Sequence, residues 1–280
     1  MVEIGKINKL RVVKELDFGI YLDGGADGEI LMPKRYVPEG CKPEDVIDAF
    51  IYFDSEDRII ATTDIPMAMV GDFALLEVVS TGTIGAFVDW GLPKDLLVPY
   101  AEQAHSIEVG TKYMVYIYID ERTRRIVGST KLDKYLDNVP PTYQYAQEVD
   151  LIIASKTDLG YKAIVNKLHW GILYQNEVFQ TLQRGQHIKG YIKKVRDDEK
   201  IDLILQRPGY ERALTLAETI LEKLSKSGGF IEVTDKTNPE TIYSMFGVSK
   251  KAFKMAIGSL YKSKLIAIEE NGIRKVNSEQ

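Results

Sequence analysis

The sequence predicts a multidomain protein in which three all-β, five-stranded barrels precede an α+β winged-helix domain. Three observations support this fold class. A block of residues repeats at a spacing of 66, a third copy follows in more divergent form, and the periodicity changes from strand to helix after Pro208-Gly209. We therefore expect domains at residues 1–65, 66–140, 145–208 and 209–280.

A single offset of 66 residues relates the first two copies without a gap. A period of this length is typical of tandem domains, because the repeats of solenoid proteins are shorter. Nine of the positions that are identical at this offset are found in the pairs Gly5 and Gly71, Val12-Val13 and Val78-Val79, Gly19 and Gly85, Asp23 and Asp89, Gly25 and Gly91, Leu31 and Leu97, Pro33 and Pro99, and Asp54 and Asp120.

The third copy follows the second at a longer offset of 75 residues. The extra length lies around Pro140-Pro141, which indicates a linker because proline ends regular structure and restrains the residue before it. The residues that match at this offset are Gly85 and Gly160, Gly110 and Gly185, and Tyr116 and Tyr191.

Each copy shows the pattern of short strands separated by turn residues. Five strands in about 65 residues fit a small closed Greek-key barrel, the OB-fold. In the fourth strand of the first copy, alternation places Ala49, Ile51 and Phe53 on one face. The expected strands are 4–13, 18–22, 28–33, 48–54 and 58–63 in the first copy, 84–91, 96–99, 113–120 and 126–130 in the second, and 159–165, 170–174, 185–196 and 201–206 in the third.

The last segment has helical periodicity. Leu214, Ala217, Leu221 and Leu224 form one apolar stripe that ends at Gly228-Gly229. A short strand, two more helices and a hairpin complete the winged-helix plan. The residues that mark them are Phe230 to Val233 for the strand, Asn238 and Ser249 as helix caps, Pro239 in a first turn, and Asn271-Gly272 as the hairpin turn between strands at 265–268 and 273–276.

The net charge of −5 is unevenly distributed along the chain. Residues 1–65 hold 8 basic and 14 acidic residues, and residues 66–140 hold 7 and 10. Residues 141–208 hold 10 basic and 8 acidic residues, and residues 209–280 hold 11 and 9. Because phosphate neutralisation drives most nucleic-acid affinity, the second half would contribute more attraction if the chain binds nucleic acid. Ordinary surface variation is the alternative explanation.

Several classes of protein are disfavoured by composition. No run of about 18 apolar residues is present, so we expect no membrane contact, and the N-terminus lacks the apolar segment of a signal peptide. Cys41 is the single cysteine, which excludes an internal disulfide and a cysteine-cluster zinc site. We therefore expect a cytoplasmic protein without a metal or other cofactor. The oligomeric state is left open.

The three copies resemble the S-one domain, the RNA-binding barrel of the largest small-subunit ribosomal protein. The residues that carry this resemblance are Phe18-Gly19-Ile20-Tyr21-Leu22, Gly85-Ala86-Phe87-Val88-Asp89, and Lys189 to Val195 with Ile201 to Gln206. Three such barrels followed by a winged helix resemble the conserved virulence factor B family over essentially the whole chain. The resemblance implies post-transcriptional control of gene expression, including virulence genes in pathogens.

The same resemblance implies aromatic residues on the second strand and basic residues on neighbouring strands as an RNA face. Aromatic rings stack bases, at roughly 1–3 kcal/mol each, while basic side chains follow the phosphates. Only the first copy has the full aromatic pair, whereas the third has the better charge. The expected RNA-binding residues of the barrels are Phe18, Tyr21, Phe87, Tyr161, Lys162, Tyr191, Lys193, Lys194 and Arg196.

Structural roles compete with these assignments. Phe87 could equally be a core residue, because strand phase can slip by one position. Lys193-Lys194 could be a solvated edge that protects a strand from self-association. Trp170 is expected to anchor the core.

In the winged helix, Lys250, Lys251 and Lys254 lie on the helix that commonly enters a DNA major groove. That helix has no Arg, Asn or Gln, so backbone contact is favoured over base reading. These lysines could bind nucleic acid or simply be exposed on a protein-contact module.

No active-site motif is found, and we expect a protein that is not an enzyme. The three histidines are scattered, and a strand-end turn explains the recurrence of Asp54 and Asp120. The leading hypothesis is a regulator that binds single-stranded RNA. The alternatives are a transcription factor that binds duplex DNA through the winged helix, and a ribosome-associated scaffold whose acidic front half meets a basic protein.

Overall fold

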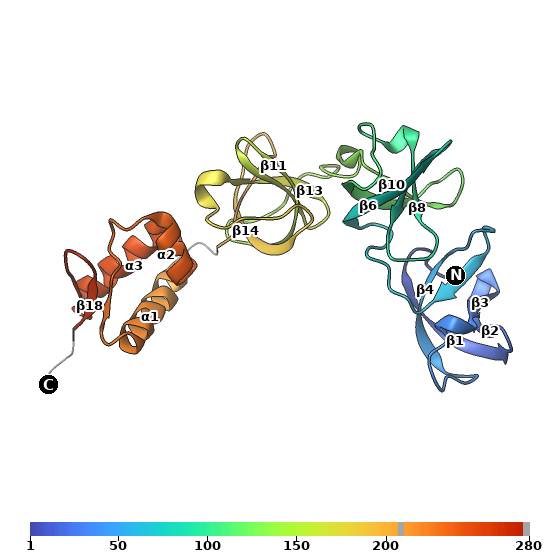
Figure 1. Ribbon diagram of the computed structural model, residues 1–280, viewed down its shortest axis with the longest axis horizontal. Coiled ribbons are helices and arrows are strands. Elements are labelled where there is room, and N and C mark those ends of the chain that lie inside the picture. Colours follow the sequence, from blue (N-terminus) through green and yellow to red (C-terminus); the bar gives the residue numbers. More distant parts are fainter. Residues whose placement is uncertain (207–209, 277–280) are drawn as a thin grey trace. The chain divides into compact units, whose positions relative to one another are not determined.

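The computed structural model describes residues 1–206 and 210–276, with the side chains of residues 210–215 not described. The chain separates into two compact units, Met1–Asn138 and Val139–Gln280. Pro208-Gly209, where the change to helical periodicity is expected, and the side chain of Leu214, expected in the first apolar stripe, lie outside the described residues. Figure 1 labels the main strands and helices.

The first unit contains two five-stranded barrels in tandem. The first barrel is closed, with the strand order β1-β2-β3-β5-β4, and the second is a five-stranded sheet of order β10-β9-β6-β7-β8. The strands are β1 (Ile7–Leu16), β2 (Gly19–Asp23), β3 (Glu29–Pro33), β4 (Val46–Phe53) and β5 (Ile59–Thr62), then β6 (Phe73–Gly82), β7 (Gly85–Asp89), β8 (Leu96–Pro99), β9 (Lys112–Ile119) and β10 (Ile126–Ser129).

The second unit contains a third barrel, which is closed in the order β11-β12-β13-β15-β14. Its strands are β11 (Glu148–Thr157), β12 (Gly160–Val165), β13 (His169–Tyr174), β14 (His187–Val195) and β15 (Ile201–Ile204). Single turns of 3-10 helix lie between strands, and they are η1 (Gly25–Asp27), η2 (Lys34–Tyr36), η3 (Tyr100–Glu102), η4 (Leu132–Lys134), which follows the last strand of the second barrel, and η5 (Gln175–Glu177).

One glycine position is shared by the three barrels and explains part of the repeat. Gly19, Gly85 and Gly160 begin β2, β7 and β12, with φ of +156°, +156° and +144°. A Cβ atom at these positions would lie 2.0–2.3 Å from the carbonyl oxygen of the next strand. The close approach of two backbones, together with the unusual φ, therefore requires glycine.

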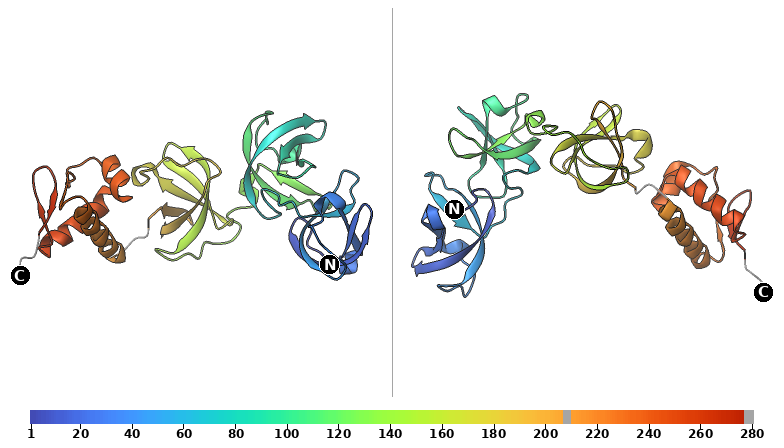
Figure 2. Two further views of the ribbon diagram at one scale, coloured as in Figure 1. Left: turned by 60° about the horizontal axis from the view of Figure 1, so that its bottom comes forward. Right: turned by 180° about the vertical axis from the view of Figure 1, so that it is seen from behind.

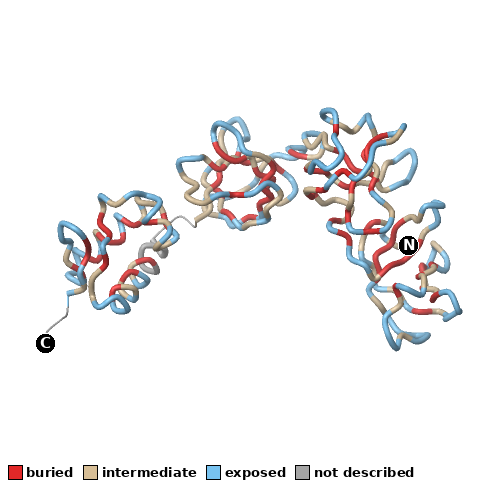
Figure 3. Tube along the Cα trace, viewed as in Figure 1, coloured by how far each residue is buried: buried red, intermediate tan, exposed pale blue. Residues whose placement is uncertain are grey.

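The first two barrels share a hydrophobic core. Ala49 and Ile51 of β4 point into the first barrel, as expected, whereas Phe50 and Tyr52 belong to the cluster that fills the second barrel and its junction. The ring of Phe50 meets Trp90 edge-on at 5.8 Å between centroids. β4 is thus buried on both faces, while Phe53, expected beside Ala49 and Ile51, is only half-buried. Figure 3 shows buried positions following the strands of each barrel.

The C-terminal domain has the winged-helix plan. Asn238 caps α2 by accepting from the backbone N–H groups of Glu240 and Thr241, and Ser249 caps α3. α1 and α3 pack together in both views of Figure 2, around a core that includes Leu224 and Phe253. The elements are α1 (Tyr210–Lys226), β16 (Phe230–Ile231), α2 (Pro239–Phe246), α3 (Lys250–Lys262), β17 (Ile266–Ile268) and β18 (Ile273–Lys275), with the sheet order β16-β18-β17.

The predicted fold class is confirmed: three closed or nearly closed five-stranded barrels precede a winged-helix domain. The expected strands recur with ends shifted by up to three residues. The exact domain boundaries at residues 65, 140 and 208 stay predictions.

Candidate nucleic-acid interface

The first barrel presents an aromatic pair on its surface. Phe18 lies in the turn between β1 and β2 and is 55% exposed. Its ring meets the half-buried ring of Tyr21 edge-on, with centroids 6.3 Å apart. The Nζ atom of Lys14 lies 4.6 Å from the centroid of Tyr21 and also pairs with Glu29. The geometry of the two rings suits base stacking, but the nearest cation, Lys14, is already neutralised by Glu29.

The second barrel offers one aromatic ring at the equivalent place. Phe87 is half-buried on β7, where it pairs in register with Ser80 as Tyr21 pairs with Lys14. Ile84 replaces Phe18 and is 55% exposed. This barrel therefore keeps half of the aromatic pair, as the sequence indicates.

The third barrel has a cation at this position, and the structure corrects one assignment there. Lys162 pairs in register with Ser155 and so occupies the place of Tyr21 and Phe87. The preceding residue, Tyr161, is 8% exposed and belongs to the barrel core. Its assignment to the RNA-binding set is wrong, because neighbouring strand residues point to opposite faces and Lys162 takes the outer one.

Trp170 is half-buried on β13, whereas we expected it to anchor the core. The Nζ atom of Lys162 lies 3.7 Å from its ring centroid, within the range of a cation–π contact. Sequence reasoning did not place the Trp170 ring beside Lys162. Its position on the third strand, beside Lys162, was the available signal.

A second cluster on this barrel joins Arg196 to Tyr174 and Asp202. Arg196 donates from Nε and from one terminal nitrogen to Oδ1 of Asp202, at 3.0 and 2.7 Å, and also contacts the Tyr174 hydroxyl. The hydrogen bonds to Asp202 raise the pKa of the Arg196 guanidinium above that of a free arginine side chain. Tyr174, which was not predicted, is half-buried. Arg196 is therefore a fixed cation rather than a mobile one.

The remaining predicted residues of β14 are arranged along its surface. Lys193 donates to Oε1 of Glu177 at 2.5 Å, and its Nζ atom is 5.9 Å from the Tyr174 centroid. Lys194 is exposed. Tyr191 is half-buried and donates to Glu148 at 3.3 Å.

The winged helix places its three predicted lysines at the start of α3. Lys251 and Lys254 are exposed, and Lys250 is half-buried. The Nζ atom of Lys254 lies 3.4 Å from a carboxylate oxygen of Asp235.

Four of the predicted cations line one groove of the second unit, with a volume of about 830 Å³. We call it the lysine groove, and its lysines are Lys193, Lys194, Lys250 and Lys251. Tyr145, Phe179 and Met255 add apolar surface, while Glu177 and Asp202 are the acidic residues of the lining. Across this region the Tyr243 hydroxyl of α2 donates to Gln180 of the third barrel at 3.0 Å.

The other predicted residues lie outside the groove. Lys162, Tyr191 and Arg196 remain on the third barrel, and Lys254 is further along α3. The structure therefore brings the cations of β14 and α3 together in one groove of the second unit.

Residues 1–206 and 210–276 contain no group of three or more His, Cys, Asp or Glu side chains that could hold a metal ion. No described helix has the length and apolar character needed to cross a membrane.

Comparison with protein families matches two segments to the S1 domain, at residues 4–64 and 70–131. Residues 218–274 match the CvfB-like winged helix domain. The uncharacterized protein YitL of Bacillus subtilis is 29% identical over 94% of this chain and 90% of its own. Conserved virulence factor B of Staphylococcus haemolyticus is 26% identical over 96% of this chain and 93% of its own.

A solved structure also spans the whole chain. It is a multidomain protein with nucleic acid binding domains from Streptococcus pneumoniae, 22% identical over 98% of both chains, with a TM-score of 0.41. The resemblance drawn from the sequence is confirmed by the family matches and the relatives: the chain carries S1 domains and a CvfB-like winged helix domain, and it has relatives named conserved virulence factor B. Together they support a nucleic-acid-binding regulatory protein.

Proposed function

We propose that this chain binds single-stranded RNA by base stacking and phosphate contacts, and that it acts in post-transcriptional control of gene expression in the cytoplasm. The third barrel and the winged helix supply most of the affinity. The observation that carries the proposal is the lysine groove, where cations from two domains line one concave surface.

The chemistry of the groove suits a single strand. Lys193, Lys194, Lys250 and Lys251 outnumber the two acidic residues of the lining, so the local field favours phosphate. Tyr145 is 69% exposed and Met255 is 62% exposed, which leaves apolar surface for unstacked bases. A duplex hides its base faces and could use only the cations.

The third barrel adds stacking surface outside the groove. Trp170 lies beneath Lys162, and Tyr174 lies beside Lys193 and Arg196. A cation beside a ring places phosphate and base contacts next to each other, as a nucleotide requires. The relatives named conserved virulence factor B support regulation, including that of virulence genes, as the purpose of this binding.

The first barrel is expected to contribute less. Its aromatic pair is exposed, but Lys14 pairs with Glu29 and Arg11 pairs with Asp23 and Glu44. Residues 1–65 carry 14 acidic against 8 basic residues. Phosphate would therefore meet more repulsion there than in the second unit.

Two other functions make distinct predictions. Duplex DNA binding through α3 is disfavoured because that helix presents lysines and no Arg, Asn or Gln to read bases. A scaffold role for the acidic first unit predicts little affinity for free RNA and co-purification with a basic protein.

Fluorescence anisotropy of the full chain with labelled single-stranded RNA, beside a matched DNA duplex, separates these functions. We expect salt-sensitive binding to the RNA and weak binding to the duplex. Preference for the duplex would favour the winged-helix alternative, and binding to neither would favour the scaffold.

A narrower experiment tests the placement on β14. Replacing Lys193, Lys194 and Arg196 together by alanine should weaken RNA binding and flatten its salt dependence. Replacing the exposed Lys9, Lys42 and Lys226 removes the same charge away from β14 and should leave the salt slope unchanged. An unchanged affinity and slope in the β14 variant would contradict the placement.

A further inference from the structure

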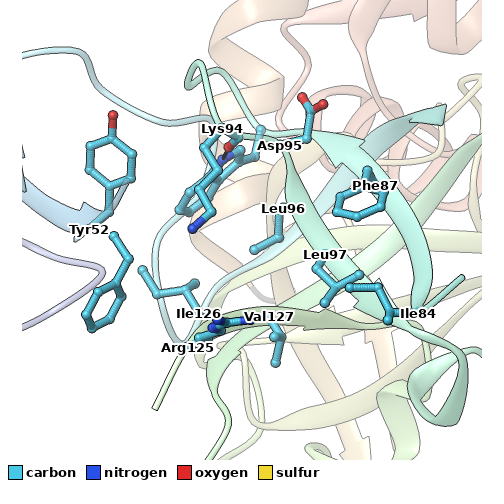
Figure 4. A pocket seen from close by; sticks show the side chains of 12 residues that line it. Tyr52, Ile84, Phe87, Lys94, Asp95, Leu96, Leu97, Arg125, Ile126 and Val127 are labelled. Atoms are coloured by element: carbon cyan, nitrogen blue, oxygen red, sulfur yellow. Dashed lines mark hydrogen bonds between the residues drawn. The ribbon is translucent and has the colours of Figure 1, made fainter. Parts of the chain in front are cut away.

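The second barrel lacks the hydrogen-bonded strand pair that closes the other two, although the two end strands lie side by side. In the first barrel β3 pairs in parallel with β5 through Leu31 and Ile60, and in the third barrel β13 pairs with β15. In the second, β8 and β10 are the two ends of the hydrogen-bonded order and do not pair. A cavity of about 290 Å³ opens there, lined by Leu97 and Ile126, the counterparts of Leu31 and Ile60 (Figure 4).

The walls of this seam pocket come from both barrels of the first unit. Phe87, Ile84 and Leu97 belong to the second barrel, and Tyr52 and Phe53 extend from the end of β4 in the first. In Figure 4, Phe87 and Tyr52 stand on opposite sides of the cavity. Flat apolar walls with aromatic rings suit the face of a nucleobase. The volume is at the small end of ligand pockets, which indicates one base rather than several.

Two cations meet one carboxylate beside the seam pocket. The Nζ atom of Lys94 donates to the backbone oxygen of Asp54 at 2.5 Å and lies 3.5 Å from Oδ1 of Asp57. Arg125 contacts the other carboxylate oxygen, Oδ2. Lys94 and Arg125 line the cavity, and their side chains are 37% and 52% exposed. Asp95 also lines the pocket, so an incoming anion competes with carboxylates already present.

We propose that the seam pocket binds one nucleotide, with its base between the two barrels and its phosphate in place of Asp57 on Lys94 and Arg125. The inference rests on the proposed RNA-binding function, and single-stranded RNA is the source of the nucleotide. Asp57 occupies the phosphate position in the free protein. The first barrel thereby contributes one wall of the site through Tyr52 and Phe53. Its Asp57 weakens nucleotide binding, because the phosphate has to displace this carboxylate.

Trp90 gives a local readout, because it lines the pocket and is one of two tryptophans in the chain. In the full-length Trp170→Phe variant, fluorescence reports on Trp90 alone. Titration with a short single-stranded RNA should change this fluorescence to saturation, while the anisotropy of the same labelled RNA measures total binding. A parallel titration with uridine or adenosine monophosphate distinguishes free nucleotide from RNA.

Charge and surface variants test the assignment with matched controls. Asp57→Asn should tighten the Trp90-detected binding by about two- to fivefold, the range of an exposed ion pair. Asp48→Asn changes the net charge by the same amount. Because Asp48 forms an exposed ion pair with Lys9 and does not line the pocket, this variant should have little effect on the Trp90-detected binding. Ile84→Glu should weaken binding by at least about fivefold. Ile65→Glu, at a 71% exposed isoleucine outside the pocket, should not.

The readouts separate this inference from the proposed function. RNA that binds by anisotropy without changing Trp90 fluorescence overturns the pocket and leaves RNA binding in place. A Trp90 response to the monophosphate alone, with no RNA binding by anisotropy, supports the pocket as a free-nucleotide site and overturns the proposed function. No Trp90 response to either ligand, or equal effects of Asp57→Asn and Asp48→Asn, overturns the pocket.

Discussion

Removal of the four lysines of the groove should flatten the salt dependence of RNA binding. Each phosphate contact to a single strand contributes about 0.7 to the slope of log affinity against log salt concentration. Lys193 shares its charge with Glu177, whereas Lys194, Lys250 and Lys251 have no acidic partner among the ion pairs of the described residues. Three to four contacts then give a slope change of about 2–3, or about 16- to 64-fold in affinity over a fourfold change in salt.

Anisotropy with a labelled single-stranded oligonucleotide between about 50 and 200 mM salt measures this slope directly. The variant carries Lys193→Ala, Lys194→Ala, Lys250→Ala and Lys251→Ala. A control removes the same charge through four exposed lysines outside the groove, which are Lys9, Lys42, Lys226 and Lys262. The control should keep the wild-type slope. Equal slopes for the wild type and the groove variant, or an equal loss in the control, would refute the reasoning.

Three further predictions concern single positions. Gly85→Ala should lower the free energy of unfolding of the first unit by about 2–4 kcal/mol in chemical denaturation, whereas Gly110→Ala, with open space around it, should cost about 1–2 kcal/mol from its positive φ alone. Trp170→Ala should weaken RNA binding by about 1–3 kcal/mol in anisotropy, and Trp170→Phe should retain most of the affinity. If both variants bind like the wild type, Trp170 is not a stacking platform. A backbone hydrogen bond from Thr123 lowers the pKa of the half-buried Asp120. Its contribution to stability is therefore present above the pKa of the unfolded chain and is lost as the pH falls through the pKa of the folded chain. Asp120→Asn should therefore destabilise at pH 7 but lose that effect in acid denaturation, and a constant difference across pH would contradict this.

Local sequence signals predicted the fold class, because turns, strands and helix caps depend on residues that are close together in the sequence. The 66-residue offset reflects required geometry: Gly19 and Gly85 share φ and the close approach to the next strand. The Asp54 side chain accepts hydrogen bonds from the backbone of Glu56 and Arg58, which explains its recurrence as a turn residue. Helix caps at Asn238 and Ser249 were equally visible, since a cap acts within three residues.

Contacts between domains were not predictable in the same way. Alternation in β4 placed Ala49 and Ile51 inside the first barrel, but it could not show that Phe50 and Tyr52 pack on the second. A strand that is buried on both faces is apolar at successive positions, so it lacks the alternation of apolar and polar residues from which the buried face is predicted. The missing hydrogen-bonded pair between β8 and β10 has no local signature either, because it depends on the meeting of distant strands.

The four lysines that line the groove were all named from the sequence, whereas its aromatic residues Tyr145 and Phe179 were not. Lys194 and Lys251 lie on the surface, as long cationic side chains usually do. Tyr161 was assigned to the surface together with Lys162, although adjacent residues of a regular strand point to opposite faces. Trp170 was assigned to the core on residue type alone, while its exposure depends on the partner strand.

Photo-crosslinking of the full chain to a single-stranded RNA that contains 4-thiouridine, followed by mass spectrometry of the peptides, tests the central claim most directly. The account predicts that most crosslinks map to the third barrel and the winged helix, near Trp170, Tyr174 and the lysine groove, with a smaller number at the seam pocket. Crosslinks confined to Phe18 and Tyr21 of the first barrel, or none above a denatured control, would contradict it.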